Sequence, residues 1–202
     1  MSLPPLTLSN AASQTVPWAT AVHENAKSKG WWESGLDSRS PGTVIFLMLT
    51  ELAESFEAYR LPDKEASDIW LVDNKPEGLP VEIADAVIRC LDYCAALAPT
   101  CGGKQVIEVS IIDALEDAPQ NFPEDFGDLM MALTKMLAGA YDSHFMEGSV
   151  ARNRRRMIRG LLRAVVTMLA YSEHEKLDVA RAIQMKHEYN ATRPYRHGGK
   201  RA

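Results

Sequence analysis

The chain has 202 residues, of which 46% are hydrophobic, so it is long enough and apolar enough to bury the core of one domain. Its formal net charge of -5 argues against a general nucleic-acid binder. No apolar stretch approaches the ~20 residues that a membrane span needs. The first residues, MSLPPLTLSN, lack the basic and apolar regions of a signal peptide. We therefore expect a cytoplasmic protein that does not bind membranes.

Helical periodicity dominates the chain and predicts an all-α fold. Residues 1–15 are rich in Pro, Ser and Asn and are expected to be loose. One domain follows over residues 16–192, and residues 193–202 form a basic tail. Within the domain we expect helices over residues 16–29, 41–60, 80–97, 122–144, 150–171 and 173–190. Residues 61–80 are turn-rich, and residues 105–115 combine strand-favouring side chains with a helical setting, so we assign a helix there.

The three cysteines, Cys90, Cys94 and Cys101, are an odd number and predict reduced thiols. A zinc site would need a fourth nitrogen or sulfur ligand at regular spacing, and the sequence offers none.

Two expected helices align with two later ones, which indicates a worn internal repeat. The segment LMLTELAESFEAYR from Leu47 aligns with LMMALTKMLAGAYD from Leu129, and IADAVIRCLDYC from Ile83 aligns with LLRAVVTMLAYS from Leu161. The second copy lacks the acids of the first, with Arg163 standing opposite Asp85. The alternative is chance similarity between amphipathic helices. If the repeat is real, residues 121–172 complete a four-helix core.

Four carboxylates stand in two pairs on the first two of these helices. Glu51 and Glu54 are three residues apart, as are Glu82 and Asp85, and this spacing leaves side chains about 60° apart on one helix face. Because the acids are embedded in apolar sequence, burying them is costly unless a cation neutralises them. Oxygen-only donors favour Mg²⁺ or Mn²⁺. The alternative is a pair of solvated faces with surface salt bridges.

An ExxE pair, a spacer of residues 55–81 and an ExxD pair together resemble the signature of MazG-like all-α nucleotide pyrophosphohydrolases. Three flanking segments are similar to that family as well: VHENAKSKGWW (22–32), DNKPEGLPVEIADAVIRCLD (73–92) and KHEYNATRPYRHGGK (186–200). Residues 98–172 depart from the family as a long insertion. This departure leaves the oligomeric state and part of the pocket wall open.

The resemblance implies Mg²⁺- or Mn²⁺-dependent hydrolysis of a (deoxy)nucleoside triphosphate to the monophosphate and pyrophosphate, for pool control or sanitation. Glu51, Glu54, Glu82 and Asp85 would hold the metal, and one of them would orient or deprotonate the attacking water. A dimer or tetramer is implied. The residues expected to bind the substrate are Lys186, Arg193, Arg89 and Lys29 for the phosphates, and Tyr189, Asn190, His23, Asn25, Trp31 and Trp32 for phosphate, sugar or base.

Three alternatives stay open. The chain could be a dUTPase or phosphoribosyl-ATP pyrophosphohydrolase type of the same superfamily, or a helical protein that binds nucleotides without hydrolysing them. The basic run ARNRRRMIRGLLR at residues 151–163 could bind nucleic acid, but it lacks interleaved aromatics, so we expect its arginines to be solvated or to pair with acids. No pattern separates purine from pyrimidine or ribose from deoxyribose.

Overall fold

The computed structural model describes residues 3–199 and confirms the all-α prediction, apart from one small hairpin. The helices are α1 (Ala11–Ser28), α2 (Pro41–Tyr59), α3 (Leu79–Leu97), α4 (Lys104–Glu116), α5 (Phe126–Asp142), α6 (Val150–His174), α7 (Val179–Thr192) and the short α8 (Arg196–Gly199). Three single turns of 3-10 helix are η1 (Leu36–Ser38), η2 (Ala98–Thr100) and η3 (Ser143–Phe145). Strands β1 (Trp70–Val72) and β2 (Lys75–Glu77) pair antiparallel. Within residues 3–199 no helix is both long and apolar enough to cross a membrane.

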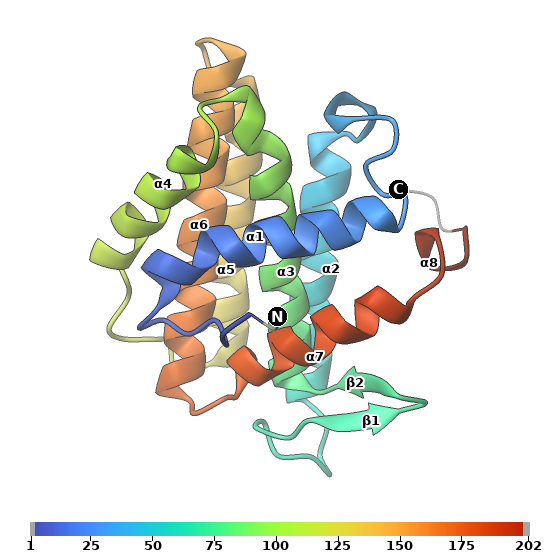
Figure 1. Ribbon diagram of the computed structural model, residues 1–202. Coiled ribbons are helices and arrows are strands. Elements are labelled where there is room, and N and C mark those ends of the chain that lie inside the picture. The colour runs from blue at the N-terminus through green and yellow to red at the C-terminus, as the bar shows by residue number, and fades with distance from the viewer. Residues whose placement is uncertain (1–2, 200–202) are drawn as a thin grey trace.

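Helix α3 is the centre of the packing. It contacts α2, α1, α7 and α6, and Figure 1 shows α1 and α7 crossing in front of it while α2, α5 and α6 run alongside. Because neighbours surround α3, fourteen of its residues are buried, including every residue from Leu79 to Ala84. Acidic side chains in its first turns therefore lie inside the molecule.

Several helix pairs in the second half of the chain resemble pairs in the first. Helix α2 packs on α3, and α5 packs on α6. Helix α1 lies on α3 much as α4 lies on α6, and the two halves meet through contacts of α2 with α5 and of α3 with α6. Helices α2, α3, α5 and α6 form a four-helix core. The interpretation of residues 121–172 as a second half requires such a core.

The N-terminal segment is more ordered than the sequence predicts. Helix α1 begins at Ala11 instead of Val16, and Pro17 lies inside it. Leu6 is fully buried, and the indole Nε1 of Trp18 donates a hydrogen bond to the carbonyl of Pro4 at 2.8 Å. The prediction of a loose segment over residues 1–15 is therefore wrong for residues 3–15, because contacts distant in sequence fix this segment; residues 1–2 lie outside the described part.

The ambiguous segment 105–115 is the expected helix, α4, but two helices begin later than expected: α5 begins at Phe126 instead of Phe122, and α7 begins at Val179 instead of Glu173. The hairpin in the connection 61–80 was missed. Its turn residues Asp73 and Asn74 have φ of 49° and 64°, the positive values of a type I′ turn. Helix α6 continues to His174, and the chain then turns at Lys176 (φ 58°). The last long helix therefore begins only at Val179.

The cysteines lie buried as free thiols, in agreement with the predicted reduced state. Burial raises the pKa of Cys90 to about 12, so this thiol stays protonated at neutral pH.

Candidate metal and nucleotide site

Three of the four predicted acidic ligands converge between α2 and α3. One carboxylate oxygen from each of Glu51, Glu82 and Asp85 lies within 4.8 Å of the others. Glu51 belongs to the inward stripe of α2 that includes Met48 and Leu52. Glu82 and Asp85 come from the first two turns of the buried helix α3. Glu51 and Glu82 are each only 4% exposed, so this acidic triad is not a solvated helix face.

Glu54 stands apart from the acidic triad. It is exposed on α2, whereas Glu51, one turn earlier, is buried. Its charge is nevertheless close enough to raise the pKa of both Glu51 and Glu82. The structure therefore places Glu54 at the rim of the cluster instead of among its buried members.

Two basic side chains are paired with the acidic triad. Arg89 contacts Oε1 of Glu51 through both Nε and Nη2, each at 2.6 Å. The Lys186 ammonium lies 2.5 Å from Oδ2 of Asp85, and Lys186 is only 3% exposed. Both residues were expected to bind phosphate, but in this structure they act as counterions and hold the carboxylates in place.

Glu82 has no such partner. Its Oε2 is buried and has no hydrogen-bond partner among the described residues. Burial, together with the neighbouring charge of Asp85, raises the pKa of Glu82 to about 8, although Lys186 acts against the rise. Burial also raises the pKa of Glu51, against the effect of Arg89. An unpartnered buried acceptor beside two other carboxylates fits a divalent cation with oxygen ligands, such as Mg²⁺ or Mn²⁺.

The raised pKa of Glu82 predicts how metal-free stability depends on pH. The folded state binds this proton more tightly than the unfolded chain, so its stabilising effect is full below about pH 4.5 and is lost as pH rises toward about 8. Glu82→Gln has no titrating group at this position, so the stability of this variant does not show this decrease with rising pH. In chelator, the free energy of unfolding of the wild type should therefore fall, relative to that of the variant, by on the order of 3 kcal/mol between pH 5 and pH 8.

Thermal unfolding across this pH range measures the effect, which corresponds to roughly 6–12 °C in Tm for a chain of this size. Glu57→Gln is the matched control, since Glu57 is exposed and pairs with Arg60. Parallel curves for wild type and Glu82→Gln would contradict the titration assigned to Glu82.

A cleft adjoins the acidic triad, between α1, α3 and α7. Its wall includes Asp85 of the acidic triad and Arg89, the partner of Glu51. Five residues predicted to bind substrate also line it: Asn25, Lys29, Trp31, Asn190 and Arg193. Ile88, Asp92, His187 and His197 line it as well. The structure thus brings α1 and α7, far apart in sequence, to one basic cleft beside the acids.

Three other predicted substrate residues have packing roles. Tyr189 lies beneath the Arg193 guanidinium, 5.9 Å from the ring centroid. Trp32 is buried against Tyr93, and its Nε1 donates to Asp92 at 2.9 Å. His23 Nδ1 is 2.7 Å from the same Asp92 carboxylate.

Asp92, His187 and His197 line the cleft but were not assigned from the sequence, nor was Arg39, which lies near Asp92 without lining the cleft. Burial raises the pKa of Asp92, while its bonds with His23 and Trp32 act against the rise. The Arg39 guanidinium is buried over the Trp32 ring, 4.7 Å from its centroid. Asp92 could have been found from its position two turns after Asp85 on α3. Nothing in the sequence signals Arg39, because η1 and its flanking loop bring it there.

The C-terminal segment closes one side of the cleft. The Tyr195 hydroxyl donates a hydrogen bond to Glu33, and the backbone N–H of Arg196 donates to the carbonyl of Lys29 at 2.9 Å. The His197 ring lies edge-on against Trp31, with centroids 5.1 Å apart. Gly30 (φ 82°) allows this approach, since a Cβ there would overlap the Tyr195 ring. The structure seats residues 195–197 of the predicted basic tail on the end of α1; residues 200–202 of that tail lie outside the described part.

Comparison of the chain with protein-family models, with curated proteins and with solved structures gave no match.

Proposed function

We propose that the protein is a divalent-metal-dependent nucleoside triphosphate pyrophosphohydrolase. The observation that carries the proposal is the buried acidic triad with the unpartnered Oε2 of Glu82, placed at the wall of a basic cleft. Neither feature alone indicates this reaction. Together they offer a cation site and a phosphate site next to each other, as phosphoryl transfer requires.

The acidic triad would hold the cation, with Glu51 and Asp85 oriented by Arg89 and Lys186. A bound Mg²⁺ or Mn²⁺ supplies positive charge to phosphate oxygens and lowers the pKa of a bound water. Glu54 is the acid that remains exposed beside the cluster, so we assign it the orientation of the attacking water.

Basic and polar groups at the other end of the cleft would bind the triphosphate and the nucleoside. Arg193 forms no ion pair within the described chain and can present its guanidinium to phosphate oxygens. Lys29 is held by the carbonyl of Ala191 at 2.7 Å, and Asn190 lies beside it on the cleft wall. Trp31 offers a ring face for stacking on a base.

The cleft encloses about 90 Å³, well below the ~300 Å³ and more of typical small-molecule sites. A nucleotide therefore fits only if the C-terminal segment that carries Arg193 and His197 moves away from α1. We assign this segment the role of a lid that opens for substrate and packs on it afterwards.

An oligomer also belongs to the proposal. An apolar groove between α2 and α5 is lined by Ile45, Phe46, Leu49 and Tyr141, and Phe46 is 67% exposed. A dimer or tetramer would cover part of this surface. Pool control or sanitation in the cytoplasm is the role that such a hydrolase would serve.

The proposal is tested by measuring pyrophosphate release from a panel of ribo- and deoxynucleoside triphosphates, with Mg²⁺, with Mn²⁺ and in chelator. We expect metal-dependent release of one pyrophosphate per monophosphate, and the best substrate identifies base and sugar. A preference for dUTP or phosphoribosyl-ATP would assign the chain to the related superfamily types. Binding of triphosphates without any turnover would replace the enzyme by a nucleotide-binding protein.

A further inference from the structure

A second cleft lies on the side of the molecule formed by α4 and the first half of α6. It has a volume of about 500 Å³ and will be called the α4–α6 cleft. One wall consists of arginines from α6, and the other consists of uncharged residues from α4 and the turn before it. The arginines are Arg152, Arg155, Arg156 and Arg159, and the uncharged residues are Gly102, Gln105, Val106, Val109 and Ser110. It shares no residue with the acidic triad or its adjoining cleft.

The positive charge of the α4–α6 cleft is largely uncompensated. Arg159 pairs with Asp113 at 3.1 Å. The other three arginines form no ion pair with any residue of the described chain. Arg155 donates to the carbonyl of Cys101 at 2.5 Å, and Arg156 donates only to neutral oxygens of Glu147 and Asn153 at 3.4 Å. Four guanidinium groups on one wall repel one another, and an anion would offset that repulsion.

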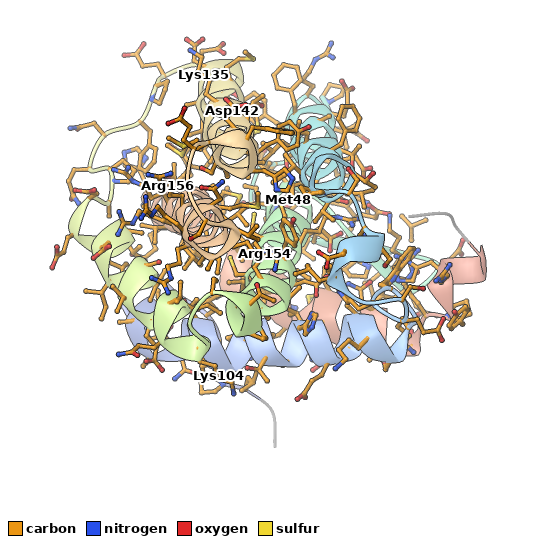
Figure 2. The ribbon with its side chains drawn as sticks, turned by 90° about the horizontal axis from the view of Figure 1, so that it is seen from above. Met48, Lys104, Lys135, Asp142, Arg154 and Arg156 are labelled. Carbon is orange, nitrogen blue, oxygen red and sulfur yellow. The ribbon has the colours of Figure 1, made fainter. Side chains whose placement is uncertain are left out.

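The directions of the arginines show which of them face the cleft. Figure 2 shows Arg156 on the side of α6 near α4, whereas Arg154 lies on the opposite side. Arg154 pairs there with Asp37 at 2.9 Å. The prediction that the 151–163 run pairs with acids or is solvated therefore describes Arg154, Arg159 and Arg163, the last of which pairs with Asp117. It also describes Arg152 and Arg155, which are exposed, whereas Arg156 is half-buried and has no acidic partner among the described residues.

Two helices begin at the same cleft. Helix α4 starts at Lys104, next to the lining residues Gly102 and Gln105, and α6 starts at Val150, next to Arg152. The N-terminal end of a helix carries partial positive charge from its unpaired N–H groups. These dipoles add to the arginine charge and favour an anion at the same place.

We propose that the α4–α6 cleft binds a ligand that carries two or more linked phosphates, independently of the metal site. The three guanidinium groups without an acidic partner, those of Arg152, Arg155 and Arg156, match the charge of a di- or triphosphate and can contact its oxygens in pairs. A volume of about 500 Å³ has room for the nucleoside of a nucleotide as well, against Val106 and Val109. A nucleic acid fits less well, because no aromatic side chain lines the cleft and the whole chain carries a net charge of -5.

The test measures binding of inorganic tripolyphosphate and of ADP to the full chain by calorimetry in chelator, so that no metal supports phosphate at the acidic triad. The variant is Arg152→Gln with Arg156→Gln, which leaves the Arg155 bond to Cys101 intact. The control, Lys176→Gln with Arg181→Gln, removes the same charge from the exposed segment around the start of α7.

We expect at least one probe to bind the wild type and the control, more weakly as ionic strength rises, and to bind the arginine variant at least tenfold more weakly. Tighter binding of ADP would identify a nucleotide as the ligand; tighter binding of tripolyphosphate would identify a free oligophosphate. Binding of neither probe by folded wild type, or equal binding by the arginine variant and the control, would overturn the proposal. Pyrophosphohydrolase activity is not involved in the readout, so the two proposals can fail separately.

Discussion

Glu82→Gln and Asp85→Asn are each expected to lower kcat/KM for metal-dependent pyrophosphate release by about 10³-fold, or roughly 4 kcal/mol of transition-state stabilisation. Each substitution keeps the size of the side chain and removes one carboxylate from a cluster whose oxygens lie within 4.8 Å of one another. Both should also weaken Mn²⁺ binding, which titration by electron paramagnetic resonance measures directly.

Glu54→Gln separates the rim residue from the buried ligands. Because Glu54 is exposed and lies outside the acidic triad, its variant should lose turnover while it keeps most of its affinity for Mn²⁺. Glu57→Gln, one turn away and paired with Arg60, should change neither quantity. Normal turnover in Asp85→Asn would show that the acidic triad takes no part in the reaction.

Lys186→Met is expected to cost about 3–5 kcal/mol of stability in chelator, because it leaves the Asp85 carboxylate beside two other buried acids without its counterion. The double variant Lys186→Met with Asp85→Asn should recover most of the loss, since the uncompensated charge is then absent. Denaturant unfolding of both variants and of the wild type at pH 8 measures these losses.

Added Mg²⁺ or Mn²⁺ should stabilise Lys186→Met more than it stabilises the wild type, because a cation at the acidic triad takes over the neutralisation of Asp85. Arg181→Gln, on the exposed side of the same helix, is the control and should cost less than about 1 kcal/mol. A loss in Lys186→Met as small as in this control would show that the ammonium does not stabilise the cluster.

Local patterns in the sequence were sufficient to bring Glu51, Glu82 and Asp85 together, but only within a set of four acids that included Glu54. Glu51 continues the apolar spacing of α2 through Met48 and Leu52, so it had to face the core, and Glu82 and Asp85 share one face of α3. The same spacing could not tell that Glu54 is exposed. It lies 60° from Glu51 on the helix, and whether a neighbour covers that direction depends on the packing of other elements.

Contacts between distant segments were beyond prediction from local sequence. The pairing of Lys186 with Asp85 joins α7 to α3, and the bonds of His23 and Trp32 to Asp92 join α1 and its following turn to α3. Residue type could only suggest that a lysine near the C-terminus binds phosphate. Its burial beside a carboxylate follows from how α7 crosses α3, which the pattern of α7 alone does not define.

The hairpin was a different kind of error. The pair Asp73–Asn74 between two short extended segments is a turn signal that the sequence did contain. Its strands were too short for alternation of apolar and polar residues to appear, and Pro76 argued against a strand. The sequence contained the turn signal, but the prediction of a turn-rich connection over residues 61–80 did not include the hairpin.

Hydrolysis in ¹⁸O-labelled water with Mg²⁺, followed by ³¹P nuclear magnetic resonance of the products, tests the central claim most directly. The account predicts that a nucleoside triphosphate yields a monophosphate containing ¹⁸O and an unlabelled pyrophosphate, and that chelator or Asp85→Asn removes both signals. Release of inorganic phosphate instead, or label in the pyrophosphate, would contradict attack at the α-phosphorus beside Glu51, Glu82 and Asp85.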